Sequence, residues 1–229
     1  MSGLGAPRVH LRRTGSTNER AKEIARGGAP HGTLVTAAEQ TAGRGRDGRR
    51  WHAPAGRALL ASLVLRDAPP LLPIAAALAV AEVAAGAARG TLSLKWPNDV
   101  LLDGRKLAGI LVEARPAERW AVLGIGLNVA VAITELPAEL GDRAATLGLA
   151  PAAIEPLLAA LLEALARRLG APAPELIAAF RERDALLERR VRFAGGDGIG
   201  AGIDERGRLL VRATDGALLA LDSGEVRLL

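Results

Sequence analysis

The chain has 229 residues, 49% of them hydrophobic and 24% charged, so it is long enough and apolar enough to bury a sizeable core. It contains no cysteine, which excludes disulfide bonds and thiolate metal sites, and its first residues lack the apolar run of a signal peptide. The net charge of +5 favours acidic or phosphorylated partners, and we expect a cytoplasmic protein without a membrane span.

The first expected element is a short helix that begins at Ser16. Glu19 follows three residues later, which is the spacing of a capping box, and Gly27-Gly28 ends the segment. We expect Lys22 on the solvated face of this helix. Two apolar runs of strand length, 32–40 and 58–66, then flank a stretch rich in glycine and arginine, which predicts a loop between two strands.

An alanine-rich segment at 71–89 predicts a buried helix that ends at Gly90, because it is too rich in alanine and carries a glutamate within it, unlike a membrane span. The elements expected after it are a strand at 92–96, a hairpin at 98–115 with an Asp-Gly turn, a strand at 119–131, a loop up to residue 150, and helices at about 151–169 and 174–190.

The last forty residues change character, since short apolar runs alternate with glycine-containing turns, as in a small β-barrel. We therefore predict two domains, 1–188 and 189–229. The predicted fold class is α/β (α+β), a mixed-sheet domain followed by a small barrel.

The loop EQTAGRGRDGRRW, from Glu39 to Trp51, carries four arginines and three glycines. One interpretation is a solvated surface loop, since runs of charge usually contact only water. The other is a phosphate cradle, because glycines let backbone N–H groups approach an anion and guanidinium groups bind phosphate oxygens in pairs. The loop is neither a Walker loop nor a dinucleotide fingerprint, and taken alone it does not decide between the two interpretations.

The segment KWPNDVLLDGRKLAGILVE is the second candidate. Its two lysines, Lys95 and Lys106, fall on opposite arms of a strand pair, so both could project toward one site or end as ordinary solvated residues. Asn98 and Asp99 place an amide and a carboxylate at a bend after Pro97. Turn chemistry alone would also explain these three residues.

Taken together, STN (16–18), GRGRDGRRW (43–51), KWPNDVLLDGRKLAGILVE (95–113) and GIGLNV (124–129) resemble the biotin protein ligases. The resemblance implies a catalytic domain of the biotin/lipoate ligase type and an SH3-like C-terminal barrel. It implies that biotin is activated with ATP to biotinoyl-5'-AMP, with release of pyrophosphate, and is then transferred to a lysine of a biotin carboxyl carrier protein domain. Biotin is the substrate, ATP and Mg²⁺ are co-substrates, and no permanently bound cofactor is expected.

The resemblance also implies roles for particular residues. The expected catalytic residues are Lys106, Arg46 and Asp99. The expected biotin-binding residues are Ser16, Thr17, Asn18, Gln40, Gly43, Arg44, Lys106 and Gly109. The expected ATP- and adenylate-binding residues are Arg44, Arg46, Arg49, Trp51, Lys95, Asn98 and Asn128. No protein ligand to a metal is assigned. Asp47 departs from the basic or neutral residue of many members, and we expect the arginine-glycine loop at 43–50 to be mobile without ligand. The segment 130–143 falls where the family has a second mobile loop over the adenylate, and whether it is ordered without ligand stays open.

Three alternatives remain open. The first is lipoate or octanoate transfer on a related fold, and the second is a non-catalytic protein that binds biotin or its adenylate. The third is a nucleic-acid-binding regulator, but only fifteen residues precede Ser16, too few for a three-helix DNA-binding domain. We therefore expect no specific nucleic acid partner and a monomer or weak homodimer. The histidines at 10, 31 and 52 are expected at the surface because their neighbours include arginine, proline and glycine, and no Ser-His-Asp pattern surrounds them.

Overall fold

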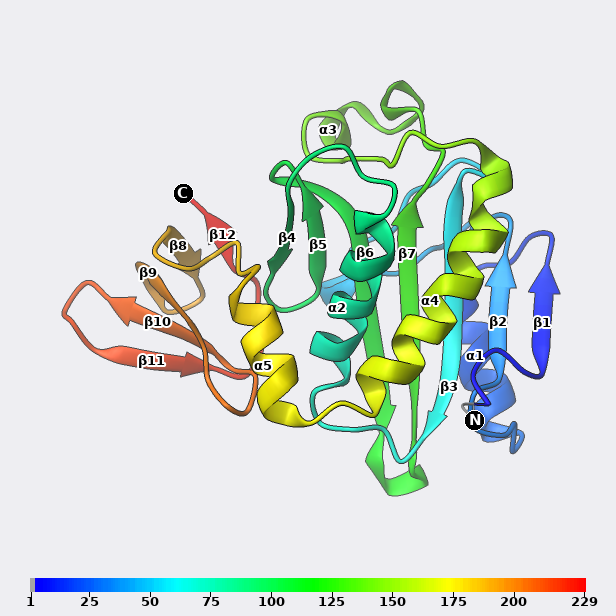
Figure 1. The fold of residues 1–229 in the computed structure, drawn as a ribbon, viewed down its shortest axis with the longest axis horizontal. Coiled ribbons are helices and arrows are strands. Elements are labelled where there is room, and N and C mark those ends of the chain that lie inside the picture. Colours follow the sequence, from blue (N-terminus) through cyan, green and yellow to red (C-terminus); the bar gives the residue numbers. More distant parts are fainter. Residues whose placement is uncertain (1–2) are drawn as a thin grey trace.

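A computed structural model describes residues 3–229 and contains two β-sheets (Figure 1). The first has seven strands in the order β1-β2-β3-β7-β6-β5-β4. It is mixed, because β1 and β2 pair in parallel and the other neighbours are antiparallel. Its strands are β1 (Arg8–Leu11), β2 (Leu34–Ala37), β3 (Ala58–Arg66), β4 (Leu92–Lys95), β5 (Asp99–Leu102), β6 (Arg105–Arg115) and β7 (Trp120–Asn128).

The second sheet is antiparallel, with five strands in the order β11-β10-β9-β8-β12. Its strands are β8 (Arg190–Phe193), β9 (Gly196–Ile203), β10 (Leu209–Ala213), β11 (Leu218–Leu221) and β12 (Arg227–Leu228). The predicted fold class is confirmed, since a mixed α/β unit is followed by a small β unit.

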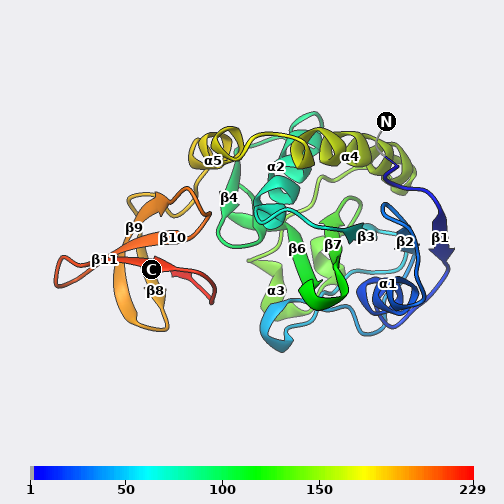
Figure 2. The same ribbon diagram turned by 90° about the horizontal axis from the view of Figure 1, so that it is seen from below.

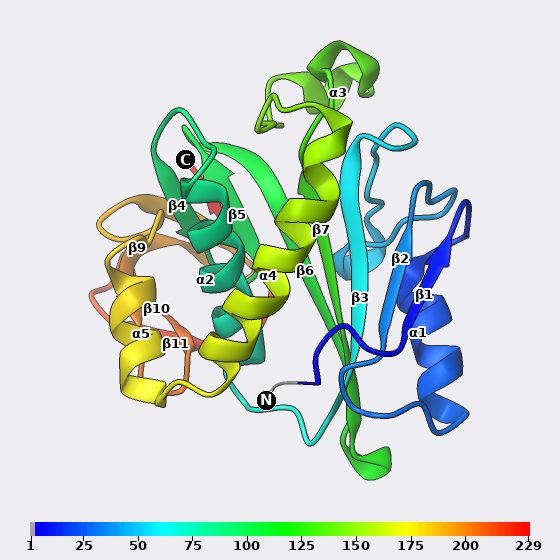
Figure 3. The same ribbon diagram turned by 45° about the vertical axis from the view of Figure 1, so that its right-hand side comes forward.

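Helices cover both faces of the seven-stranded sheet (Figure 2). The helices are α1 (Thr17–Arg26), α2 (Leu72–Ala85), α3 (Ala138–Gly141), α4 (Ile154–Leu169) and α5 (Ala173–Arg181). Helices α2 and α4 lie on one face, and α1 and α3 lie on the other. Helix α2 is apolar on nearly all sides. It packs on the sheet and lies beside α4 on the same face, as Figure 3 shows, and it also contacts α5. This confirms the predicted buried helix.

The two sheets share one hydrophobic core. A single cluster of buried residues extends from α2 through Leu94 and Phe180 to Val211 of the second sheet. The Trp96 indole also donates a hydrogen bond across the junction to the Gly207 carbonyl oxygen, at 3.0 Å. The division at residue 188 therefore stays a prediction, and the two units pack as a continuous body.

Two of the predicted helices end earlier than expected. Helix α2 stops at Ala85, not at residue 89, because Gly86 caps it and the amides of Ala87 and Ala88 both turn back to the Ala84 carbonyl. Helix α5 stops at Arg181, not at residue 190. Beyond it the chain joins the edge of β4, where Leu94 donates to the Arg183 carbonyl and accepts from the amide of Ala185.

The expected capping box at the start of α1 does not form. Ser16 is the N-cap residue but makes no side-chain capping bond. The amide of Thr17, the first helical residue, donates to Gln40 Oε1, at 2.7 Å. Glu19, the expected reciprocal partner, is turned toward two cations, Lys22 and Arg44.

Candidate active site

A pocket of about 520 Å³ opens on the face of the sheet that carries α1. Strands β6 and β7 form its floor, the loop 43–52 and the first turn of α1 form one side, and residues 136–144 and the end of the chain form the other. The predicted site residues that line it are Ser16, Thr17, Asn18, Gln40, Arg44, Arg46, Arg49, Trp51, Lys95, Asn98, Asp99, Lys106, Gly109 and Asn128.

Glycines make the floor of the pocket flat. Gly109 of β6 pairs directly with Gly126 of β7, and Gly124 lies two residues earlier on the same face. A Cβ atom at Gly126 would lie 2.6 Å from the Trp51 ring, and one at Gly124 would overlap the Asn18 carboxamide. The missing side chains therefore let two groups from other elements lie directly on the strands.

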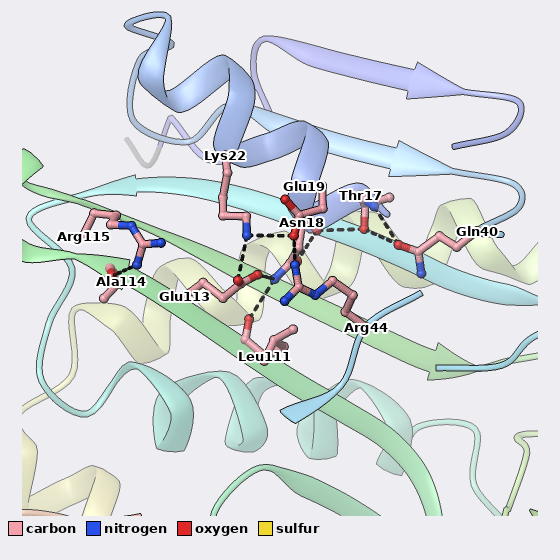
Figure 4. Close-up of polar contacts among 11 residues, drawn as sticks. Thr17, Asn18, Glu19, Lys22, Gln40, Arg44, Leu111, Glu113, Ala114 and Arg115 are labelled. Carbon is pink, nitrogen blue, oxygen red and sulfur yellow. Dashed lines mark hydrogen bonds and ion pairs between the residues drawn. The ribbon is translucent and has the colours of Figure 1, made fainter. Parts of the chain in front are cut away.

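One end of the pocket is polar and uncharged. Gln40 Oε1 accepts hydrogen bonds from both the amide and the hydroxyl of Thr17, at 2.7 and 2.9 Å (Figure 4). The buried Ser62 hydroxyl lies 2.8 Å from Thr17 Oγ1 and 2.6 Å from Asn18 Oδ1. This end, with Ser16 beside it, suits a small ligand that both donates and accepts hydrogen bonds.

The other end of the pocket is cationic. Lys106 Nζ lies 2.6 Å from Asp99 Oδ1 and 5.8 Å from the centre of the Trp51 ring, and the Lys106 side chain is 38% exposed. Lys95 lines the same region from β4. Burial lowers the pKa of Lys95 below its ordinary value, and the nearby charge of Lys106 acts in the same direction, while Asp99 opposes it. A desolvated ammonium among other cations is stabilised by an anionic ligand.

The arginine-glycine loop closes on itself beside this cationic end. Arg44 and Arg50 form an isolated antiparallel bridge, and a short 3-10 helix spans Arg46–Gly48 between them. Two of the arginines are paired with carboxylates from other elements, Arg44 with Glu19 and Arg49 with Glu225, the latter at 3.1 Å. The loop between two strands is confirmed, and its positive charge is partly compensated.

Two asparagines of the pocket each donate a side-chain hydrogen bond to a backbone carbonyl. Asn98 Nδ2 donates to the Ile110 carbonyl at 2.8 Å, and Asn128 Nδ2 donates to the Ala145 carbonyl at 2.9 Å. Within residues 3–229, the buried Asn128 Oδ1 has no hydrogen-bond partner. It is therefore an acceptor available to a ligand with an amino group.

One predicted site residue lies outside the lining, and one expectation about a lysine was wrong. Gly43 is buried behind the wall, where an added Cβ would lie 2.6 Å from the Trp51 carbonyl oxygen. Lys22 is not on a solvated face, because its side chain is only 7% exposed and its ammonium lies 2.8 Å from carboxylate oxygens of Glu19 and Glu113. A buried ion pair is costly to break, so substitution of Lys22 should destabilise the protein, unlike substitution of a solvated lysine.

Sequence reasoning missed several lining residues. Glu225, Arg227 and Leu228 reach the pocket from the end of the chain, at and just before β12. They lie more than ninety residues beyond the last motif, and no local pattern marks them. Residues Leu136 to Ala144 contribute as well, within the loop that was expected to cover the site. The three histidines are exposed as expected, although His52 also lies at the rim of the pocket.

Within residues 3–229 we find no group of three or more histidine, aspartate or glutamate side chains arranged to hold a metal ion. None of the helices in the same range is long and apolar enough to cross a membrane.

The fold and the pocket define a class of protein whose pocket has a hydrogen-bonding end and a cationic end, which suits a ligand that is polar at one end and anionic at the other. Residues 10–129 match the biotin/lipoate A/B protein ligase family, and the chain belongs to this family. The resemblance indicated by the motifs is thereby confirmed.

The biotin–[acetyl-CoA-carboxylase] ligase of Mycobacterium tuberculosis is 38% identical over 234 residues, which cover 93% of this chain and 85% of that protein. The bifunctional ligase/repressor BirA of Bacillus subtilis is 44% identical over 140 residues, which cover 58% of this chain but only 43% of that longer protein. Among solved structures, the biotin protein ligase from Aquifex aeolicus in complex with biotin and ATP superposes with a TM-score of 0.82 at 29% identity, covering 97% of this chain and 98% of that one.

Proposed function

We propose that this chain is an ATP-dependent biotin protein ligase. In the first reaction the biotin carboxylate attacks the α-phosphorus of ATP, which forms biotinoyl-5'-AMP and releases pyrophosphate. In the second, an uncharged lysine amine of a biotin carboxyl carrier protein domain attacks the activated carbonyl carbon, and AMP leaves. The observation that carries the proposal is a single pocket with a hydrogen-bonding end and a cationic end, in a family that includes biotin ligases.

The polar end supports biotin as the ligand. The ureido ring of biotin has two N–H groups and one carbonyl oxygen, and Ser16, Thr17, Asn18 and Gln40 offer matching acceptors and donors. Leaving such buried groups without partners costs about 1–3 kcal/mol each. The dithiolane ring of lipoate makes no such bonds, so this wall favours biotin over the lipoate alternative.

The cationic end supports the adenylation step. We assign Lys106 to the biotin carboxylate and the α-phosphate, and Arg44, Arg46, Arg49 and Lys95 to the phosphates of ATP. The biotin carboxylate and the α-phosphate repel each other as they approach. Fixed positive charges stabilise the transition state, in which negative charge accumulates. Asp99, beside Lys106, is assigned to orient the incoming lysine amine, while Trp51, Asn98 and Asn128 border the nucleotide, with Asn128 Oδ1 accepting from an amino group of the base.

Magnesium fits this site as a companion of ATP. Mg²⁺ is usually bound through nucleotide phosphates, waters and one or two carboxylates, and Asp99 and Glu225 are carboxylates of the lining. When bound, it would neutralise phosphate charge during adenylation.

The proposal is tested by incubating the chain with biotin, ATP, Mg²⁺ and a biotin carboxyl carrier domain, and measuring the mass of the carrier. A mass increase equal to one biotinoyl group supports it. Biotin-dependent exchange between ATP and pyrophosphate separates an enzyme from a silent binding protein, and no exchange together with no mass increase refutes the proposal. The monomer or weak dimer, the cytoplasmic location and the lack of specific DNA binding stay predictions.

The arginine-glycine loop is expected to become protected when substrates bind. Trypsin cleaves after arginine, and the exposed Arg44, Arg49 and Arg50 lie in a segment with little regular structure and several glycines. Biotin plus ATP should slow cleavage there severalfold, because anions draw the guanidinium groups inward. Mass spectrometry of timed digests measures this. Cleavage after the exposed Arg206, in a turn of the second sheet, is the internal control, and equal loop cleavage with and without substrates would contradict the expectation.

As the pH rises, the affinity for ATP is expected to begin to fall at a lower pH than it would at a site with an ordinary lysine. The pKa of Lys95 is lowered, chiefly by burial, so its charge is present below that pKa and is lost as the pH rises through it. The Michaelis constant for ATP should therefore begin to increase at a pH below the ordinary lysine pKa of about 10.4. The variant Lys95→Arg keeps its charge throughout and should show a flatter profile. Parallel profiles for the two proteins would remove Lys95 from nucleotide binding.

A further inference from the structure

A cluster of four charged groups lies directly behind the polar end of the pocket, and Lys22 is its buried member (Figure 4). Glu113 of β6 and Glu19 of α1 both accept hydrogen bonds from Lys22, each at 2.8 Å, and Glu19 also pairs with Arg44 of the loop. Glu113 further accepts a hydrogen bond from Asn18 Nδ2 at 3.0 Å. The cluster therefore connects to the pocket through one side chain, Asn18.

Glu113 is held in its ionised form. Burial alone would raise its pKa, but hydrogen bonds from Lys22 and Asn18, together with the charges of Lys22 and Arg44, outweigh that effect and place the pKa below its ordinary value. An ionised carboxylate accepts hydrogen bonds and donates none. Glu113 therefore dictates which half of the Asn18 carboxamide faces it.

The orientation of Asn18 determines the direction of the next hydrogen bonds. Its Nδ2 must face Glu113, so its Oδ1 faces Ser62 at 2.6 Å. Since an amide oxygen only accepts, the single Ser62 hydroxyl hydrogen goes to Asn18. Ser62 Oγ then has no hydrogen left for Thr17 Oγ1, and the single Thr17 hydroxyl hydrogen goes either to Ser62 Oγ, 2.8 Å away, or to Gln40 Oε1, 2.9 Å away. Both Asn18 Oδ1 and Thr17 Oγ1 keep a lone pair for a further donor.

We propose that Glu113, with its counter-ion Lys22, acts as a positioning residue that sets the Asn18–Ser62–Thr17 side of the pocket to accept hydrogen bonds from N–H groups of the ligand. Neither charged residue lines the pocket itself. The inference rests on the proposed function, in which those N–H groups belong to the ureido ring of biotin. On this basis, the N–H groups are the part of the ring that this side of the pocket recognises.

The variant Glu113→Gln reverses the direction of these bonds with little change in shape. Lys22 can only donate, so it takes the single oxygen of the new amide, and the amide nitrogen faces Asn18. Asn18 must then turn its own oxygen toward residue 113 and present its nitrogen to Ser62. The pocket wall gains a donor where it had an acceptor, which opposes a ligand N–H group.

The experiment compares biotin with two analogues in which CH₂ replaces one or the other ring N–H group. The wild-type chain should bind one analogue at least tenfold more weakly than biotin. In Glu113→Gln the Michaelis constant for biotin should rise at least tenfold. The affinity of this variant for that analogue should then be less than threefold weaker than its affinity for biotin. The Michaelis constant for ATP should change less than twofold. Lys22→Met, which leaves Glu113 without its main counter-ion, should change biotin binding in the same direction.

The matched control is Glu82→Gln, because Glu82 of α2 also pairs with two cations, Arg167 and Arg168, on the opposite face of the sheet. Its thermal stability should fall while its biotin and analogue constants stay at wild-type values. If Glu113→Gln does not fold, Ser62→Ala carries the test, since it breaks the same sequence of bonds without removing a charge and should also weaken biotin binding.

A wild-type discrimination between biotin and the analogues that persists unchanged in Glu113→Gln or Ser62→Ala would overturn the inference. So would a loss of stability with an unaltered biotin constant. Failure of the proposed function is separate, because it would be seen first as a wild-type chain that forms no biotinoyl adenylate.

Discussion

Replacement of Lys106 by alanine is expected to slow biotinoyl adenylate formation on the order of a hundredfold or more, while biotin binding weakens far less. Lys106 Nζ is the cation beside Asp99 and Trp51, and its charge matters most when the biotin carboxylate and the α-phosphate approach each other. A fixed ammonium at such a site contributes several kcal/mol to the transition state, which is about a hundredfold or more in rate. Rapid measurement of pyrophosphate release, with biotin affinity measured separately, checks both parts.

Two further variants define the result for Lys106. Lys106→Arg should restore activity only in part, because a planar guanidinium on a different stem does not reproduce a compact charge. Arg105→Ala, at the exposed neighbouring position on β6 and outside the pocket lining, is the control and should keep nearly full activity. Normal pyrophosphate release from Lys106→Ala would remove this residue from the mechanism.

Addition of one methyl group at Gly124 is expected to weaken biotin binding on the order of tenfold to a hundredfold. Gly124 pairs with Ser62 across β3 and β7, and the new Cβ of Gly124→Ala would occupy the place of the Asn18 carboxamide. Asn18 is held by Ser62, Glu113 and the Leu111 carbonyl, so it has little freedom to move aside. Overpacking of this kind costs about 1–3 kcal/mol, and here it falls on the ligand-binding wall.

Isothermal titration with biotin measures the loss of affinity in Gly124→Ala. Thermal unfolding measures how far the substitution also destabilises the whole protein. The control is Gly86→Ala at the end of α2, where the nearest atom to the new Cβ is a carbonyl oxygen at an ordinary contact distance of 3.7 Å. Wild-type biotin affinity in Gly124→Ala would mean that Asn18 has no fixed position in the wall.

The site was largely predictable because its residues fall in continuous motifs. The loop 43–51 and the segment 95–113 each supply several lining side chains from adjacent positions, and the strand pairing of β5 with β6 brings Asp99 and Lys106 together. The hairpin was marked by its Asp-Gly turn. These features depend on local sequence, so local reasoning found them.

The errors share a different cause. Lys22 seemed solvated from the helix alone, and only β6, ninety-one residues later in the chain, supplies the carboxylate of Glu113 that buries it. The capping box at Ser16 did not form, and Glu19, its expected reciprocal partner, pairs with Arg44 from the loop 43–52. Glu225 reached the pocket from the end of the chain. In each case a partner distant in sequence outweighed a local preference.

The segment after α5 also affects how the molecule meets its neighbours. Because residues 183–185 hydrogen-bond to β4, they cover one border of the seven-stranded sheet, and the chain itself occupies a place where another protein's strand would otherwise add. The opposite border is β1, only four residues long, with the charged Arg8 at its start. Short, charged edge strands resist pairing with other chains, so the broad central sheet has little surface on which aggregation by strand addition can begin.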